Sequence, residues 1–184
     1  MNVSVRKANV IASYIREIHN IYTRGDFTEP SFYPCLQRLF EALSGDGCTV
    51  ISAPKKTEAG FPDFIVRRGT EIVGYIEAKP LGADLEREER TEQLQRYRNA
   101  FPNLILTNFL QFRLYGNGKL VSTAELCDAS DLSGPKPPNV LSKHLKPSSI
   151  SLANFTTSQC LRFKMLRGWH PCLRRRRNSQ ETLS

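Results

Sequence analysis

Apolar residues recur at helical spacing in the first part of the chain. Between about Val5 and Tyr22 they fall on one face of a predicted helix, which Gly25-Asp26 ends. A second helix begins at Thr28-Glu29-Pro30, where Thr28 or a neighbour caps it and the acid lies at its positive end. The apolar stripe of this helix, which we interpret as core, consists of Phe32, Leu36, Leu39, Phe40 and Leu43.

Short apolar runs predict strands in the middle of the chain. The run from Cys48 to Ala53 predicts one strand. The runs from Phe64 to Val66 and from Ile72 to Ile76 flank a turn that contains Gly69, which is typical of a β-hairpin.

A highly charged segment follows the hairpin. Asp84 caps a predicted third helix that runs to about Ala100 and has a narrow apolar seam at Leu94, Tyr97 and Phe101. We interpret its charged residues as a solvated face held by pairs four residues apart. The expected pairs are Glu86–Arg90 and Glu92–Arg96.

Further strands complete the predicted domain. Leu104 to Thr107 predicts one strand, and the runs Leu110 to Leu114 and Lys119 to Val121 flank an Asn117-Gly118 turn, which indicates a second hairpin. Helices and strands in this order predict a mixed α/β fold.

The composition changes beyond Asp128. Prolines and a glycine predict a linker over residues 129–140, between a domain at 1–128 and a basic tail at 141–184. The tail shows neither helical nor strand periodicity, so we expect it to be disordered or non-native. The alternative, nucleic-acid binding or a localisation signal, rests on its arginine run, Arg174 to Arg177.

The charge of the chain is concentrated in that tail. The net charge is +8, and residues 141–184 hold nine of the 26 Lys and Arg residues but one of the 18 acids. The other residues therefore contain 17 basic and 17 acidic side chains. Bulk charge gives no support to DNA binding by the predicted domain.

Other features exclude several classes of protein. No apolar run approaches the roughly 20 residues of a membrane-spanning helix, and the N-terminus lacks a secretory signal. The five cysteines are an odd number without a CxxC pair, which argues against a structural zinc site or a disulfide framework. We expect a cytoplasmic protein without a membrane partner.

The first hairpin carries the candidate chemistry. Side chains alternate along a strand, so Glu77 and Lys79 share one face while Ala78 faces the other. Asp63 begins the neighbouring strand, and the hairpin can bring its carboxylate beside that of Glu77. The two carboxylates and the Ala78 carbonyl could hold Mg²⁺ for phosphodiester hydrolysis. We expect Lys79 to position the attacking water, with its pKa lowered by cationic neighbours.

A salt-bridged surface hairpin explains much of the same pattern. The residues by themselves leave these two interpretations evenly balanced.

Several motifs carry a resemblance to a known family. Pro62-Asp63 followed by Glu77-Ala78-Lys79 resembles the active-site motif of the PD-(D/E)xK nuclease superfamily. Gln93 and Tyr97 resemble the QxxxY element of one branch, and Glu29 lies where the superfamily often has a further metal-associated acid.

The resemblance is closest to the N-terminal nuclease domain of type ISP and related type IIG restriction–modification enzymes, over about residues 15–125. The segments that carry it are Thr28-Glu29, Ser31-Phe32-Tyr33-Pro34, Gly60 to Phe64, Gly74 to Lys79, Glu92 to Arg98, Asn103 to Asn108 and Phe112 to Tyr115.

This resemblance implies a restriction-endonuclease-like PD-(D/E)xK core with a mixed central sheet flanked by helices. It implies double-stranded DNA as partner and Mg²⁺ as cofactor, with Mn²⁺ as a substitute. The implied catalytic residues are Asp63, Glu77, Lys79, Gln93 and Tyr97, and the implied metal-binding residues are Asp63, Glu77, Ala78 and Glu29. We expect nucleic-acid contacts from Arg96, Arg174, Arg175, Arg176 and Arg177.

The chain also departs from that family. Family members continue into helicase-like, methyltransferase and target-recognition parts, for which this chain has no room. We therefore expect the metal-dependent DNA endonuclease domain of a restriction–modification system in a truncated chain, with a frameshifted tail from about residue 145. The alternative is a catalytically silent fragment that binds DNA weakly, or an interaction subunit that docks on separately encoded helicase, methyltransferase or specificity modules.

Overall fold

The computed structural model describes residues 3–44, 47–52 and 54–138 of the 184-residue chain. The helices are α1 (Val3–Arg24), α2 (Tyr33–Ser44), α3 (Leu85–Glu88) and α4 (Glu92–Ala100), with short 3-10 helices η1 (Glu29–Phe32) and η2 (Ala129–Ser133). The strands are β1 (Cys48–Ser52), β2 (Phe64–Arg68), β3 (Glu71–Ala78), β4 (Asn103–Thr107), β5 (Gln111–Gly116) and β6 (Lys119–Glu125).

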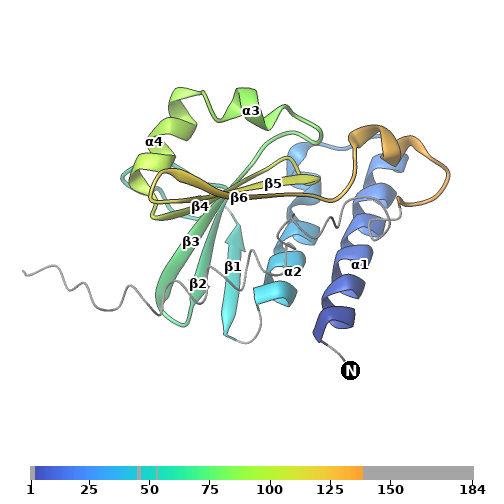
Figure 1. The fold of residues 1–184 in the computed structure, drawn as a ribbon, viewed down its shortest axis with the longest axis horizontal. Helices are drawn as coiled ribbons and strands as arrows, with labels where there is room; N and C mark the ends of the chain where they lie inside the picture. The colour runs from blue at the N-terminus through green and yellow to red at the C-terminus, as the bar shows by residue number, and fades with distance from the viewer. Residues whose placement is uncertain (1–2, 45–46, 53, 139–184) are drawn as a thin grey trace, which may run out of the picture.

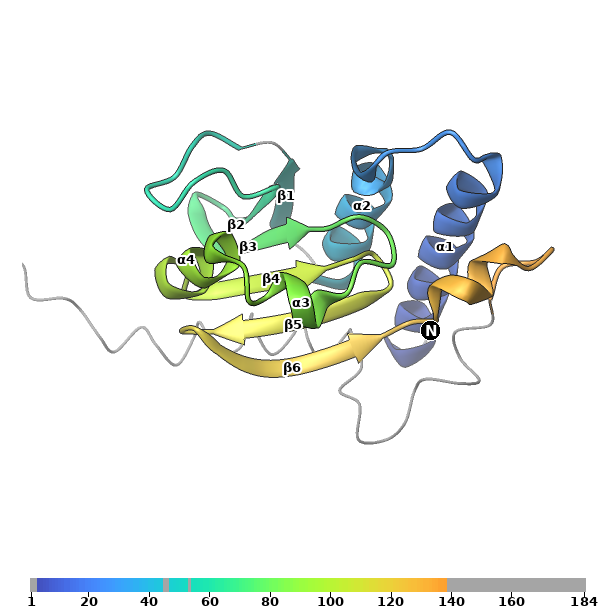
Figure 2. The ribbon, with the colours of Figure 1, turned by 90° about the horizontal axis from the view of Figure 1, so that it is seen from above.

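The six strands form one mixed sheet in the order of the chain, β1 to β6. Neighbouring strands are antiparallel except β3 and β4, which are parallel and pair Ala78 with Thr107. The crossover from β3 to β4 carries α3 and α4 (Figures 1 and 2). Because β2 and β3 are antiparallel, the C-terminal end of β3 lies beside the start of β2.

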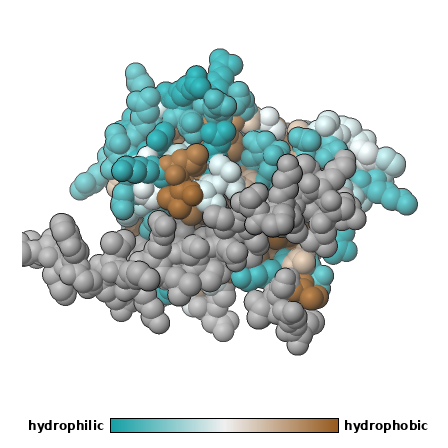
Figure 3. Space-filling model, viewed as in Figure 1, coloured by the Kyte–Doolittle hydropathy of each residue, from teal (hydrophilic) through white to brown (hydrophobic). Residues whose placement is uncertain are grey.

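Helices cover both faces of the sheet. The face toward α1 and α2 packs an extensive apolar core that includes Ile15, Leu36, Phe40 and Ile76. On the other face, α3 and α4 cover a smaller cluster (Figure 1); it contains Leu85, Leu94, Tyr97, Leu104, Leu106 and Tyr115. Hydrophilic residues form the outer surface of this α3–α4 layer, at the top of Figure 3.

The predicted mixed α/β architecture is confirmed at this level. Both N-terminal helices are present, and the five residues of the predicted stripe in the second one are all buried. The first hairpin is also present as β2 and β3, which pair Phe64 with Ile76. Periodicity identified these elements because each buries one face against the core.

The prediction of one continuous helix from Asp84 to Ala100 is wrong. Asp84 caps α3 as predicted, but the helix ends after Glu88, and α4 begins after Thr91. Thr91 has extended backbone angles, and its hydroxyl accepts a hydrogen bond from the Leu94 amide at 3.4 Å. A threonine in this geometry caps a new helix, so the local sequence favours two short helices.

The start of the predicted linker packs on the domain. Leu132, in η2, is fully buried, and His19 Nε2 lies 2.9 Å from the carbonyl oxygen of Gly134. Residues 139–140 and the predicted tail, with Arg174 to Arg177, lie outside the described residues. The division of the chain into domain, linker and tail therefore stays a prediction.

Two further observations concern the described residues alone. None of their helices combines the length and the apolar character needed to cross a membrane. Their cysteines, Cys35, Cys48 and Cys127, are all free thiols.

Candidate functional site

The C-terminal end of β3 holds a partly buried ion pair. Lys79 Nζ donates to Glu77 Oε1 at 3.0 Å, and the two side chains are 14% and 4% exposed. Ala78, between them, packs into the core on the opposite face. The alternation predicted for these three residues is confirmed. Because the pair is largely shielded from water, it differs from the surface salt bridge of the alternative interpretation.

Asp63 joins this pair from the neighbouring strand. It directly precedes β2, and its Oδ2 accepts a hydrogen bond from the Ala78 amide at 2.8 Å. The hydrogen bond fixes the carboxylate against the end of β3, on the strand that carries Glu77 and Lys79. The sequence predicted this meeting of Asp63 and Glu77, and the antiparallel pairing of β2 with β3 produces it.

Tyr33, to which the sequence assigned no role, connects a third acid to the site. Its hydroxyl lies 2.7 Å from Asp63 Oδ1 and 2.8 Å from Glu29 Oε1. Glu29 therefore lies one hydrogen-bonded step from Asp63. Glu29 begins η1 and Tyr33 begins α2 directly after it, so this one helical junction supplies both groups. In the sequence, the sign of this contact is that a tyrosine follows an acid by four residues. That spacing is common in unrelated helices.

An aromatic cluster fixes the position of Tyr33. Its ring centroid lies 4.7 Å from that of Phe64 and 6.4 Å from that of Phe109. Phe109 is fully buried despite a φ of +71°, and its carbonyl accepts a hydrogen bond from the Tyr14 hydroxyl at 2.8 Å. A phenylalanine in the left-handed region is strained, so surrounding contacts must hold it there. The turn between β4 and β5, which contains Phe109, thus helps to hold Tyr33 in place.

Gln93 and Tyr97 extend the site onto α4. Gln93 Oε1 accepts from Lys79 Nζ at 3.3 Å, and Gln93 Nε2 donates to the Tyr97 hydroxyl at 3.4 Å. These contacts place the predicted glutamine directly on the predicted lysine. Tyr97 is 1% exposed, and in the described part of the chain Gln93 connects it to Lys79. The predicted catalytic role of Tyr97 stays a prediction.

Burial and the neighbouring carboxylate control the protonation of Glu77. Desolvation first, and then the charge of Asp63, raise the pKa of Glu77 from 4.5 to about 7, although Lys79 opposes the shift. Desolvation also raises the pKa of Glu29, and the Asp63 charge adds to it.

The pKa of Lys79 is raised as well. Burial on its own lowers it, but the charge of Glu77, its hydrogen bond, and the charges of Glu88 and Asp63 outweigh that effect. The sequence predicted that cationic neighbours lower the pKa of Lys79. That prediction concerns a site with a metal cation bound beside Lys79, so it stays a prediction.

The residues of this site fit a divalent cation that prefers oxygen ligands. Glu77 Oε2 is buried and has no hydrogen-bond partner among the described residues. An orphaned carboxylate oxygen in such a place is costly unless a ligand satisfies it. Across the described ranges, however, no group of three or more His, Cys, Asp or Glu side chains is placed to hold a metal. A cation here would therefore need the two carboxylates, a backbone carbonyl and water, as Mg²⁺ commonly accepts.

Arg96 has a structural partner in place of the predicted one. Its Nε donates to the Ala59 carbonyl at 2.7 Å, and its guanidinium lies 5.8 Å from the Tyr97 ring centroid. The predicted ion pair with Glu92 is therefore absent from the described part of the chain, whereas Glu86–Arg90 is present at 3.0 Å. Arg96 remains exposed, and its role in nucleic-acid binding stays a prediction.

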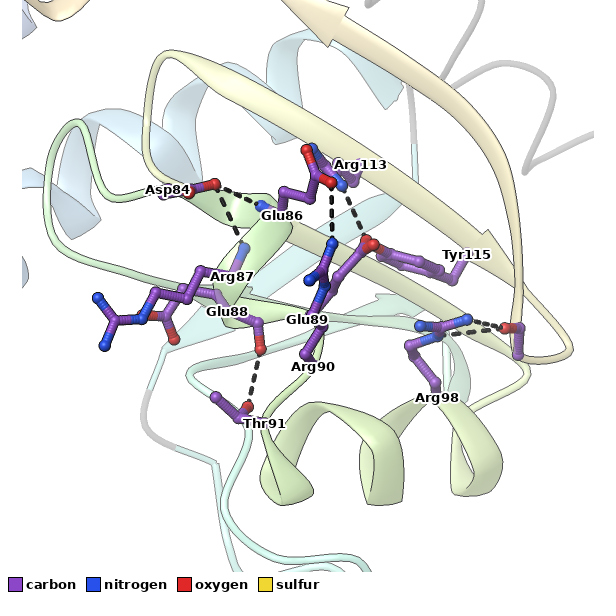
Figure 4. A network of polar contacts seen from close by, with 11 residues as sticks. Asp84, Glu86, Arg87, Glu88, Glu89, Arg90, Thr91, Arg98, Arg113 and Tyr115 are labelled. Atoms are coloured by element: carbon purple, nitrogen blue, oxygen red, sulfur yellow. Dashed lines mark hydrogen bonds and ion pairs between the residues drawn. The ribbon is translucent and has the colours of Figure 1, made fainter.

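A second polar network anchors the break between α3 and α4 to the sheet (Figure 4). Glu89 Oε2 accepts from Arg113 Nη1 at 2.9 Å and from the Tyr115 hydroxyl. Burial on its own raises the pKa of Glu89, but these two hydrogen bonds and the charges of Arg113 and Arg98 together outweigh it, so the pKa is lowered. The neighbouring Glu88 is thereby held where its charge acts on Lys79 and Glu29.

Comparison with known proteins gives one informative result. No family profile and no curated protein sequence matches the chain. Among solved structures, the chain is similar to the cryo-EM structure of a DrdV–DNA complex, with a TM-score of 0.56 and 24% sequence identity. The match covers 69% of this chain and 13% of the DrdV chain. At this identity the similarity shows a shared fold.

Proposed function

We propose that the described domain is the metal-dependent DNA endonuclease domain of a restriction–modification system, with a PD-(D/E)xK site. One observation carries the proposal: Asp63, Glu77 and Lys79 meet at the adjoining ends of two strands, where one Glu77 oxygen has no hydrogen-bond partner among the described residues. The fold shared with part of a DNA-bound protein supports DNA as substrate. The type ISP or IIG assignment rests on the sequence motifs.

The residues of the site have separate tasks in this proposal. Asp63, Glu77 and the Ala78 carbonyl would hold Mg²⁺ or Mn²⁺, with Glu29 as an auxiliary acid. The bound metal supplies Lewis-acid polarisation and a more acidic water. Lys79 places a positive charge and a proton donor beside Glu77, where it can orient the attacking water and balance phosphate charge. Gln93 holds the Lys79 ammonium in that position.

Plasmid cleavage tests this proposal. We expect wild-type protein to nick or linearise supercoiled DNA with Mg²⁺ and not with EDTA. Glu77→Ala and Lys79→Ala should each reduce the rate by about 100-fold or more, the usual scale for a lost proton-transfer or water-orienting group.

Lys119→Ala is the matched control, because Lys119 is exposed at the start of β6, at the end of the sheet opposite to Lys79. Equal nicking by wild type, Glu77→Ala and Lys79→Ala would contradict the assigned roles. Calorimetric titration with Mg²⁺ gives a second readout, in which Glu77→Ala should bind more weakly.

A second candidate follows from the coverage of the match. The match covers 13% of the DrdV chain, so other modules could be needed for cleavage or for recognition of DNA sequence. In that case the domain is a silent fragment or an interaction subunit. Wild type that binds Mg²⁺ and DNA without cleaving it, and that cleaves once separately encoded modules are added, would favour the subunit.

A further inference from the structure

The loop of residues 54–61 presents an unusual aromatic side chain beside the site. This loop connects β1 to β2 and projects next to α4 (Figure 2). Phe61 is 63% exposed, more than any other large hydrophobic residue in the described chain. Lys56 Nζ lies 5.6 Å from the centroid of its ring, and Lys55 is exposed as well. The loop therefore combines an aromatic face with two cations.

Several contacts hold this loop in one conformation. Thr57 and Gly60 exchange backbone hydrogen bonds of 2.7 and 3.2 Å, and the Thr57 hydroxyl donates to the same Gly60 carbonyl. Arg96 fixes the Ala59 carbonyl, and Tyr97 lies where a side chain on Gly60 would be. Phe61 is thus held outward by a braced turn. Such preorganisation lowers the entropic cost of binding a partner.

The position of Phe61 in the chain identifies the partner. Phe61 precedes Asp63 by two residues, which span at most about 7 Å of extended chain. A DNA strand carries a phosphate about every 3.4 Å along the helix axis. A duplex with a phosphate on a metal ion held by Asp63 would therefore have its flanking nucleotides within reach of Phe61.

We propose that loop 54–61 is a DNA-contacting element of the site, an inference that rests on the proposed function. Phe61 makes an apolar contact with a base or sugar next to the phosphate that the metal ion would hold at Asp63. Lys55 and Lys56 contact backbone phosphates on either side. Apolar side chains that press against base steps, flanked by cations on phosphates, are an established way of binding and bending duplex DNA.

Duplex binding measured by fluorescence anisotropy gives the first test. With the full chain and Ca²⁺ in place of Mg²⁺, to slow cleavage while a cation bridges the carboxylates and the phosphate, Phe61→Ala should weaken binding by roughly fivefold or more without changing the salt dependence. The double variant Lys55→Ala/Lys56→Ala should reduce the slope of the logarithm of the binding constant against the logarithm of salt concentration by about 1.8. Leu120→Ala and Lys119→Ala, which alter an exposed hydrophobe and a lysine at the opposite end of the sheet, should bind like wild type.

A fluorescent side chain at the same position reports contact directly. Trp169 is the only tryptophan in the sequence, so Phe61→Trp is made in a Trp169→Phe background. Saturation with unlabelled duplex should quench and shift its emission, whereas Leu120→Trp in the same background should respond little.

The outcomes separate this inference from the proposed function. Unchanged emission from the Phe61→Trp chain at saturation, or an affinity of Phe61→Ala within about twofold of wild type, overturns the inference. If wild type still cleaves DNA and Glu77→Ala does not, the endonuclease proposal survives that failure. If the loop contacts DNA but wild type never cleaves, the loop assignment stands and the endonuclease proposal fails.

Discussion

Tyr33 has one hydroxyl proton and two carboxylate neighbours. Glu29 and Asp63 both lie within hydrogen-bond distance of it, so it accommodates two acids that would otherwise repel each other directly. Burial and these two carboxylates raise the pKa of Tyr33, so the hydroxyl keeps its proton at any physiological pH. The tyrosine can therefore orient Asp63 but cannot act as a base.

Tyr33→Phe should preserve the ring packing and remove this orientation. We expect Mg²⁺ affinity and cleavage rate to fall by about 10- to 100-fold, the usual cost of losing a group that orients a metal ligand. Titration with Mg²⁺ and plasmid cleavage both measure the effect. Tyr22→Phe is a suitable control, because the Tyr22 hydroxyl lies away from the acids of the site and 3.4 Å from the Ser133 hydroxyl. Wild-type affinity in Tyr33→Phe would show that Asp63 needs no such support.

Glu77 should make stability depend on pH. Its pKa of about 7 in the folded protein exceeds its ordinary value of 4.5, so the folded state binds the proton more tightly than the unfolded state. The contribution of Glu77 to stability is then fully present below about pH 4.5 and is lost as pH rises through about 7. The raised pKa of Glu29 acts in the same direction.

In EDTA, wild type should lose about 1–3 kcal/mol of unfolding free energy relative to Glu77→Gln over that interval. Glu77→Gln, which cannot ionise, should show a clearly flatter profile in urea unfolding measured at several pH values. Parallel profiles for the two proteins would show that burial does not control the ionisation of Glu77.

At the scale of elements, α4 supports the site in two directions. Gln93 faces Lys79, while Arg96 and Tyr97 brace loop 54–61. The same short helix thus fixes both the lysine and the loop that leads into Asp63. The break after α3 allows this placement, because α4 does not have to continue the axis of α3.

Gly60 is the sensitive point of this arrangement. Its φ is +135°, and a Cβ there would lie 3.0 Å from the Tyr97 hydroxyl and 3.1 Å from its ring, which is buried and cannot retreat. Gly60→Ala should therefore destabilise the fold by about 2 kcal/mol or more and reduce cleavage. Gly69→Ala is the control, because its φ is +59° but nothing lies within 4 Å. It should cost about 1 kcal/mol and leave cleavage unchanged.

At the scale of the whole molecule, the segment after β6 returns to the first helix. Leu132 is fully buried in the core shared by α1 and α2, and His19 contacts the Gly134 carbonyl. The N-terminal helix is therefore held by residues that follow it by more than 100 positions.

Leu132→Ala should destabilise the protein by about 2–4 kcal/mol, as expected for a cavity in a packed core. Leu120→Ala, which changes a leucine that is 49% exposed, should cost well under 1 kcal/mol. Urea unfolding of both variants measures the difference. Equal stabilities would mean that residues 129–134 contribute little to the folded domain.

Local patterns in the sequence determined the helices α1 and α2, the hairpin of β2 and β3, and the meeting of Asp63 with Glu77 and Lys79. These features depend on periodicity and on short connections, which neighbouring residues specify. Gln93 was identified through the family resemblance, since helical spacing does not distinguish a functional glutamine from a solvated one.

Only the tertiary structure decided which distant groups complete the site. Tyr33 meets Asp63 across 30 positions, and Arg96 meets Ala59 across 37. Such contacts depend on how two helices and a loop pack on the sheet, and one-dimensional spacing does not encode them. The sequence therefore determined the acid–lysine motif, and packing decided what orients it and which side chain lies exposed beside it.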